Sequence, residues 1–146
     1  MKILVVEDEV NLCRLYREEL EEEGHTVLTA ATAAAAMELF GSERPDIVTL
    51  DINLSHADEG FQLLRRMKEV RPAVPVIMLS AYDYRDDFAV WCADDYVVKS
   101  SDLSALMRIV RQAERKNLGR VDRMQAAALA TIRDNDGGGD LSCARR

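Results

Sequence analysis

Residues 47–51 read IVTLD, a short apolar run that ends on an aspartate. A continuous apolar run of about four residues is typical of a strand that is buried on both faces, as in parallel sheets. Three further runs share this form: ILVV at 3–6 before Glu7 and Asp8, VIML at 76–79 before Ser80, and YVV at 96–98 before Lys99. In an open parallel sheet, ligands bind beyond the carboxyl ends of the strands. We therefore expect these polar side chains to meet at one edge of one sheet.

The segments between these runs carry helical and loop patterns. A further strand is predicted at 25–30, with His25 at the surface, and residues 53–60 are predicted as a polar loop that ends in Gly60. Helices are predicted at 9–23, at 33–40 closed by Gly41, at 61–71, at 83–91 with Trp91 packed on the body, and from about residue 102. Five strands that alternate with helices predict an α/β fold, a doubly wound five-stranded parallel sheet with helices on both faces. Right-handed crossovers favour the flavodoxin-like strand order 2-1-3-4-5.

The C-terminal part of the chain extends beyond this fold. We assign residues 1–116 to one domain, 117–136 to a helical extension and 137–146 to a flexible tail that begins with GGG. The last helix has an apolar stripe that is expected to face the sheet and then continues into the extension: Leu103, Leu106, Val110 and Ala113, followed by Leu118, Val121, Met124, Ala128 and Ile132. Two interpretations of residues 117–133 stay open, a helix packed on the body and a contact between two copies of the chain.

Composition argues against several classes of protein. The chain has 146 residues, of which 48% are apolar and 31% charged, as in ordinary soluble domains. No apolar stretch approaches about 18 residues and the start does not resemble a signal peptide, so we predict a cytoplasmic protein without membrane contact. Residues 1–110 carry 11 basic and 21 acidic groups, and this balance argues against nucleic-acid binding. The three widely spaced cysteines predict neither a disulfide framework nor a zinc site.

The strand-end residues have the chemistry of a phosphoryl-transfer site. Glu7, Asp8 and Asp51 are three carboxylates, and crowded carboxylates repel one another unless a cation intervenes. Magnesium suits such a set of hard oxygen ligands. An aspartate can itself act as the nucleophile and form an aspartyl phosphate, and Asp51 is the best placed because it ends a central strand. Lys99 would pair with a carboxylate or phosphate oxygen, and Ser80 would donate a hydrogen bond to the same oxygens.

In this combination the chain resembles the receiver domain of two-component response regulators. The matching segments cover residues 1–116 in the family's order: VVEDE at 5–9, RPDIVTLDINL at 44–54, Gly60, PVIMLSAYD at 75–83 and ADDYVVKS at 93–100. The resemblance implies that Asp51 accepts a phosphoryl group from a histidine kinase or a phosphotransfer protein. It also implies that Asp8 is a direct magnesium ligand, that Glu7 acts through water, and that the backbone carbonyl of Asn53 is a further ligand.

The resemblance implies roles for further residues and for the whole chain. Ser80 and Lys99 would hold the phosphoryl oxygens, and Tyr96 would be the aromatic switch that turns inward when Ser80 moves. Asn53 and Tyr82 would set the lifetime of the phosphate, because both would lie near the path of hydrolytic water. The implied function is that of a single-domain response regulator, which is no enzyme in the usual sense and signals by a conformational change that alters binding to another protein.

The sequence also departs from the family pattern. Glu7 stands where an aspartate is usual, Ser55 stands where a proline is usual, and the segment from 80 to 99 is short by about three residues, close to one helical turn. Ser100 follows Lys99 in place of a proline in a cis bond. A non-proline cis bond costs about 3 kcal/mol, so a trans bond is expected.

Two other functions stay open. A pseudo-receiver would keep the fold as a binding scaffold without phosphorylation, and the altered loops favour it slightly. A phosphatase of the haloacid dehalogenase type would use a D-x-D-x-[TS] motif, which DINLS at 51–55 echoes loosely. That motif needs an acid where Asn53 stands.

Overall fold

The computed structural model describes residues 1–56, 58–82 and 93–136, with side chains as far as residue 133. The predicted helix at 83–91, its Trp91 and the predicted tail at 137–146 lie outside the described residues. The chain divides into two compact units, Met1–Ala113 and Glu114–Arg146. None of the helices in the described ranges combines the length and the apolar character that a membrane span requires.

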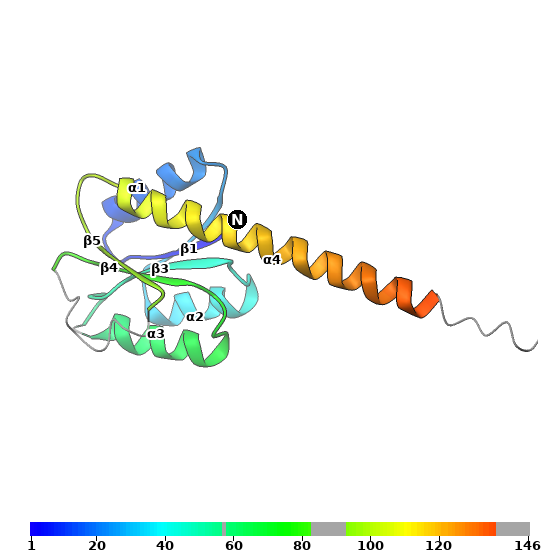
Figure 1. Ribbon diagram of the computed structural model, residues 1–146. Helices are drawn as coiled ribbons and strands as arrows, with labels where there is room; N and C mark the ends of the chain where they lie inside the picture. Colours follow the sequence, from blue (N-terminus) through cyan, green and yellow to red (C-terminus); the bar gives the residue numbers. More distant parts are fainter. Residues whose placement is uncertain (57, 83–92, 137–146) are drawn as a thin grey trace, which may run out of the picture. The chain divides into compact units, whose positions relative to one another are not determined.

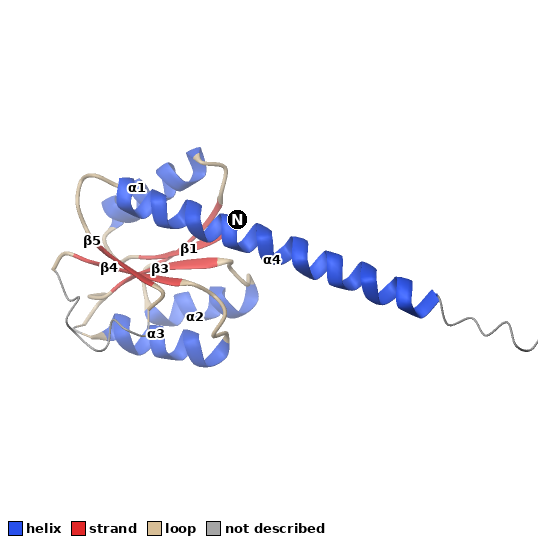
Figure 2. Ribbon diagram, in the orientation of Figure 1, coloured by secondary structure: helices blue, strands red, loops and turns tan. Residues whose placement is uncertain are grey.

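Five parallel strands form one sheet, and their order β2-β1-β3-β4-β5 confirms the predicted topology (Figure 2). The strands are β1 (Lys2–Val6), β2 (Thr26–Ala30), β3 (Ile47–Asp51), β4 (Val76–Ser80) and β5 (Asp95–Val98). Every residue of β3 and β4 is buried, as the uninterrupted apolar runs predict for strands with both faces covered. The apolar runs in the sequence therefore identified the two strands at the centre of the sheet.

Helices cover both faces of the sheet (Figure 1). On one face lie α2 (Ala33–Ser42) and α3 (Glu59–Val70), and on the other lie α1 (Val10–Glu22) and the first turns of α4 (Ser104–Asp136). Each face has its own buried apolar layer, because alternate residues of a strand point to opposite sides. The layer under α1 and α4, which we call the α1/α4 layer, consists of these buried residues: Ile3, Val5, Tyr16, Leu20, Val27, Ile47, Ile77, Leu79, Leu106, Met107 and Val110.

Two helix boundaries were predicted wrongly at glycines. The predicted stop at Gly41 is wrong, because α2 continues to Ser42 and the backbone turns left-handed only at Arg44, with φ 49°. The predicted loop over 53–60 is too long, because α3 begins at Glu59 and Gly60 lies in its first turn. Asp58 turns the chain into this helix with φ 66°, a conformation that aspartate tolerates better than most residues.

Of the remaining predictions about the fold, some are confirmed and one is wrong. Gly24, with φ 90°, ends α1 as predicted. His25 is not a surface residue: it is buried, and its Nδ1 lies 3.2 Å from the N-terminal amine of Met1. The stripe that was expected to face the sheet does so, since Leu106 and Val110 are buried in the α1/α4 layer. Beyond it, α4 continues through residue 117 without interruption to Asp136.

Candidate functional site

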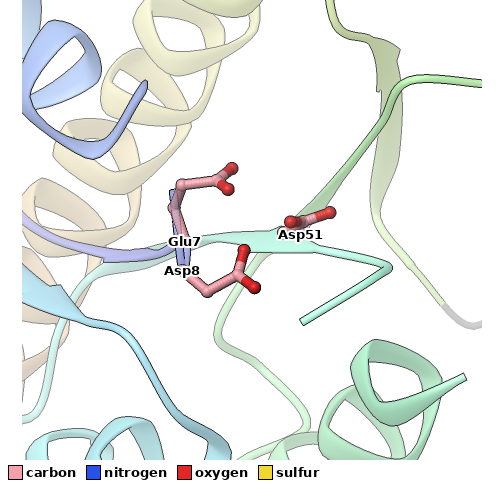
Figure 3. A group of neighbouring side chains, drawn as sticks. All are labelled: Glu7, Asp8 and Asp51. Atoms are coloured by element: carbon pink, nitrogen blue, oxygen red, sulfur yellow. The ribbon is translucent and has the colours of Figure 1, made fainter. Parts of the chain in front are cut away.

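Three carboxylates gather at the carboxyl edge of the sheet (Figure 3). Glu7 and Asp8 follow β1, and Asp51 is the last residue of β3. The two strands are neighbours with Val6 opposite Leu50, so the residues that come next in each strand are brought together. One oxygen of each carboxylate lies within 4.8 Å of the others. Glu7 and Asp51 are buried, and Asp8 is exposed.

Lys99 joins this cluster from the end of β5. Its Nζ lies 2.8 Å from Oε2 of Glu7 and 3.2 Å from Oδ2 of Asp51. The Lys99 side chain is 16% exposed, so solvent screens these two ion pairs only in part. The described peptide bonds are all trans, and the bond from Lys99 to Ser100 follows the expectation from the sequence.

Burial and neighbouring charges shift the pKa values of two groups in the cluster, Glu7 and Lys99. Burial raises the pKa of Glu7 to about 7, and the neighbouring charge of Asp51 adds to this shift while Lys99 opposes it. Burial alone would lower the pKa of Lys99, but its interactions with Glu7 and Asp51 outweigh burial and raise it. Three carboxylates thus stand beside one ammonium, so acidic groups outnumber basic ones in the cluster. A divalent cation with oxygen ligands fits this donor set.

Backbone contacts fix the position of Asp51. The amide of Asn53 donates to Oδ1 of Asp51 at 3.0 Å, which leaves Oδ2 toward Lys99. The amide of Gly60 donates to the carbonyl of Ile52 at 3.0 Å, so the first turn of α3 packs directly on the end of β3. A Cβ atom at Gly60 would lie 2.4 Å from the carbonyl oxygen of Asp51. The sequence did not predict this close approach, although Gly60 was recognised as part of the family pattern.

Ser80, Tyr82 and Tyr96 are linked through the backbone of Tyr82. The buried Ser80 accepts a hydrogen bond at its Oγ from the amide of Tyr82, at 3.1 Å. The hydroxyl of the half-buried Tyr96 donates to the carbonyl oxygen of Tyr82. The side chain of Tyr82 is exposed, as is that of Asn53. The predicted site residues other than Tyr96 therefore lie at or just beyond the carboxyl ends of four strands, and Tyr96 reaches this edge from within β5 through its hydroxyl.

Two residues beneath the site were not predicted to bear on it. Tyr16 lies within the predicted helix at 9–23 and Thr49 within the predicted strand at 47–51, and neither was expected to act at the site. Both are buried in the layer under Asp51. Thr49 comes two residues before Asp51, and the period-two alternation of a strand is the signal that could have placed it on the same face.

Comparison with known proteins identifies the class. The response regulator receiver domain model matches residues 3–111, and the chain belongs to this family. Response regulator TrrA from Thermotoga maritima, solved in complex with Mg²⁺-BeF, is 37% identical, has a TM-score of 0.73, and is matched over 77% of this chain and 97% of that one. A second structure, with a TM-score of 0.71, holds TrrA in complex with the histidine kinase ThkA.

Longer regulators are also related. The transcriptional regulatory protein TcrA of Mycobacterium tuberculosis is 36% identical over 119 residues, which cover 80% of this chain and 47% of that protein. The alkaline phosphatase synthesis transcriptional regulatory protein PhoP of Bacillus subtilis is 34% identical over 101 residues, which cover 67% and 42%. The chain thus spans about half the length of the curated relatives it matches.

Proposed function

We propose that this chain is a phosphorylation switch in which Asp51 accepts a phosphoryl group from a histidine kinase or a phosphotransfer protein. The observation that carries this proposal is the position of Asp51, with Oδ2 3.2 Å from Lys99 Nζ and with two further carboxylates beside it. A carboxylate oxygen of Asp51 would form the new O–P bond while the P–N bond of the phosphohistidine breaks. The bonding electrons leave with the imidazole, which takes up a proton.

The donor set suits magnesium. Glu7, Asp8, Asp51 and the backbone carbonyl of Asn53 would hold the ion, with Glu7 acting through water. Magnesium would supply positive charge against the oxygens of the transferred group. Two observations support this part of the proposal: the three carboxylates, with one oxygen of each within 4.8 Å of the others, and the Mg²⁺-BeF bound by TrrA.

Ser80 and Lys99 would hold the phosphoryl oxygens, and Tyr96 would report their movement. The contacts through the Tyr82 backbone support this role, because a shift of Ser80 would move the carbonyl that accepts the Tyr96 hydroxyl. The phosphate would shift an existing equilibrium between two conformations. The proposed output, as in a single-domain regulator, is altered binding to another protein.

The test is the intact mass of the chain after incubation with acetyl phosphate and magnesium, beside an Asp51→Asn variant. We expect a gain of one phosphoryl group in the native chain and none in the variant. If the folded native chain gains none, the alternative is a pseudo-receiver scaffold, which Ser100 in place of proline favours. Titration with magnesium and beryllofluoride then separates the two, because a scaffold without the site would bind neither.

We further propose that the extension over residues 117–136 pairs two copies of the chain. Leu118 and Leu129 are 11 residues apart, as are Val121 and Ile132, and all four side chains are exposed. An 11-residue spacing returns to the same face of a helix after three turns. A stripe that repeats in this way can pack against its own copy, and helical patterns much longer than about 25 residues are typical of coiled coils.

Light scattering over a range of concentrations tests this pairing on the full chain. We expect a dimer that Leu129→Glu converts to a monomer. Ala127→Glu, which adds the same charge away from the stripe, should leave the dimer intact. A native chain that stays monomeric at every concentration would contradict the pairing.

A further inference from the structure

Two hydroxyl groups interrupt the apolar layer beneath the phospho-acceptor site. The layer between the sheet and α1 and α4 is built from aliphatic side chains, among which Tyr16 is 2% exposed and Thr49 is 1% exposed. A buried hydroxyl is costly without a hydrogen-bond partner, and nearly all buried polar groups in proteins have one. Thr49, whose Oγ1 has no hydrogen-bond partner among the described residues, therefore requires an explanation that packing alone does not give.

Thr49 lies directly below Asp51 on this face of the sheet. It is two residues before Asp51 in β3, so the two side chains point to the same side. It stands between Val5 of β1 and Ile77 of β4, at the centre of the sheet. In the part of the chain that the structure describes, no protein group forms a hydrogen bond with its Oγ1.

Tyr16 approaches the same place from α1. This helix starts at the edge of the sheet that carries the site, directly after Glu7 and Asp8, and helical side chains lean toward the N-terminus of their helix. The ring of Tyr16 therefore leans toward the cluster. Burial raises the pKa of its phenol, and the charges of Lys99, Glu7 and Asp51 also act on it. The hydroxyl stays protonated and can donate.

Lys99 supplies the third group. It follows Val97 by two residues, and Val97 packs on the α1/α4 layer, so Lys99 leaves the strand on the side of Tyr16. An ammonium group has three N–H donors. The ammonium forms ion pairs with Glu7 Oε2 and Asp51 Oδ2. These two partners leave an N–H group that can donate to an acceptor on the inner side of the cluster.

We propose that Tyr16 and Thr49 hold an ordered water molecule beneath Lys99, and that Tyr16 is thereby a positioning residue for Lys99 in phosphoryl transfer to Asp51. The role in transfer rests on the proposed function, whereas the water site does not. A buried water typically makes about three hydrogen bonds, and the Tyr16 hydroxyl, Thr49 Oγ1 and a Lys99 N–H supply that number. The water accepts from Lys99 and so fixes the direction of the ammonium toward Asp51.

The first experiment measures the rate of phosphorylation by acetyl phosphate at saturating magnesium. Tyr16→Phe and Thr49→Val each remove a hydroxyl and keep the shape of the side chain. We expect each to slow the reaction by about tenfold, the effect of one hydrogen bond that orients a charged group. The double variant should be no slower than the slower single variant, because both changes empty the same water site. Thr49→Ser, which keeps the hydroxyl, should retain the native rate.

Two further measurements separate positioning from stability. Magnesium affinity should be unchanged in both single variants, and thermal unfolding should show that each is folded. Native rates in both single variants, or rate losses that multiply in the double variant, would overturn the positioning role. A high-resolution crystal structure of the native chain tests the water site even if the chain is not phosphorylated, and a site closed by apolar side chains would overturn it.

Discussion

Replacement of Gly60 by alanine is expected to damage the site through a shift of the backbone. The added Cβ would lie 2.4 Å from the carbonyl oxygen of Asp51, 2.5 Å from that of Ile52 and 2.6 Å from the Ile52 Cα. Carbon and carbonyl oxygen approach comfortably to about 3.3 Å, so α3 and the end of β3 must separate by about 0.9 Å. All three obstructing atoms belong to the backbone, and no change of side-chain rotamer can relieve the clash.

The magnitude follows from two separate costs. Overpacking of this kind destabilises by about 1–3 kcal/mol, against a gain of up to about 1 kcal/mol from the better helix propensity of alanine. The midpoint of thermal unfolding should therefore fall by up to about 10 °C. The chemical effect is larger, because a misplacement of about 1 Å at a reacting group can cost about 100-fold in rate. Asp51 would be displaced from Lys99, which now lies 3.2 Å away.

The assay combines thermal unfolding by circular dichroism with the phosphorylation rate measured by intact mass. Gly41→Ala is the matched control, because Gly41 lies within α2 and a Cβ there would meet nothing within 4 Å. This control should be as stable as the native chain or more so, and should react at the native rate. A folded Gly60→Ala protein that is phosphorylated at the native rate would refute the reasoning.

Four other outcomes are expected. The pKa of Glu7, about 7, lies above its ordinary value of 4.5, so protonated Glu7 stabilises the metal-free fold at low pH. This contribution, about 3 kcal/mol, should be lost as the pH rises from about 4.5 to 7, which urea unfolding without metal would measure. Magnesium binding must displace the proton on Glu7. Calorimetry should therefore show that the affinity for magnesium rises about tenfold per pH unit below pH 7 and levels off above it. An affinity that is equal at every pH would contradict the pKa shift. Tyr82→Ala should lose its phosphate faster than the native protein, as followed by the decay of the phosphorylated mass, because the ring is proposed to lie near the path of hydrolytic water. An unchanged or slower decay would refute this. Asp94→Ala should lower the free energy of unfolding by about 1–3 kcal/mol in chemical denaturation. The reason is that Asp94 Oδ2 accepts a hydrogen bond from the buried Val76 amide at 2.7 Å and pairs with Lys68. A loss well below that range would show that water replaces the carboxylate.

The sequence predicts the sheet and the convergence of the site because both depend on local patterns. Residues 47–50 are apolar apart from Thr49, and a mostly apolar run that ends on a charged residue marks the carboxyl end of a buried strand. Parallel topology then brings Asp51, Glu7 and Lys99 to one edge without knowledge of any distance. The strand register that places Val6 opposite Leu50 and so sets the actual spacing is a tertiary property.

The features that escaped prediction depend on contacts between distant segments. Gly60 was assigned to a loop because glycine often ends a loop, whereas its actual constraint is the close approach to Asp51. Gly41 was read as a helix stop, but the chain leaves helical geometry only at Arg44. His25 was expected at the surface because no local pattern shows that the N-terminal amine of Met1 reaches its ring.

The alternation of β3 has a consequence for how this chain can vary over evolutionary time. A single-residue insertion or deletion between Ile47 and Asp51 would rotate the acceptor carboxylate to the opposite side of the sheet, away from Glu7 and Lys99. Substitution is therefore the only change of sequence that the strand accepts without loss of chemistry. Changes of length can occur where side chains need not alternate between two faces, as at the exposed Ser55 and His56 before α3. The number of residues in β3 before Asp51 is thus under the same constraint as the identity of Asp51 itself.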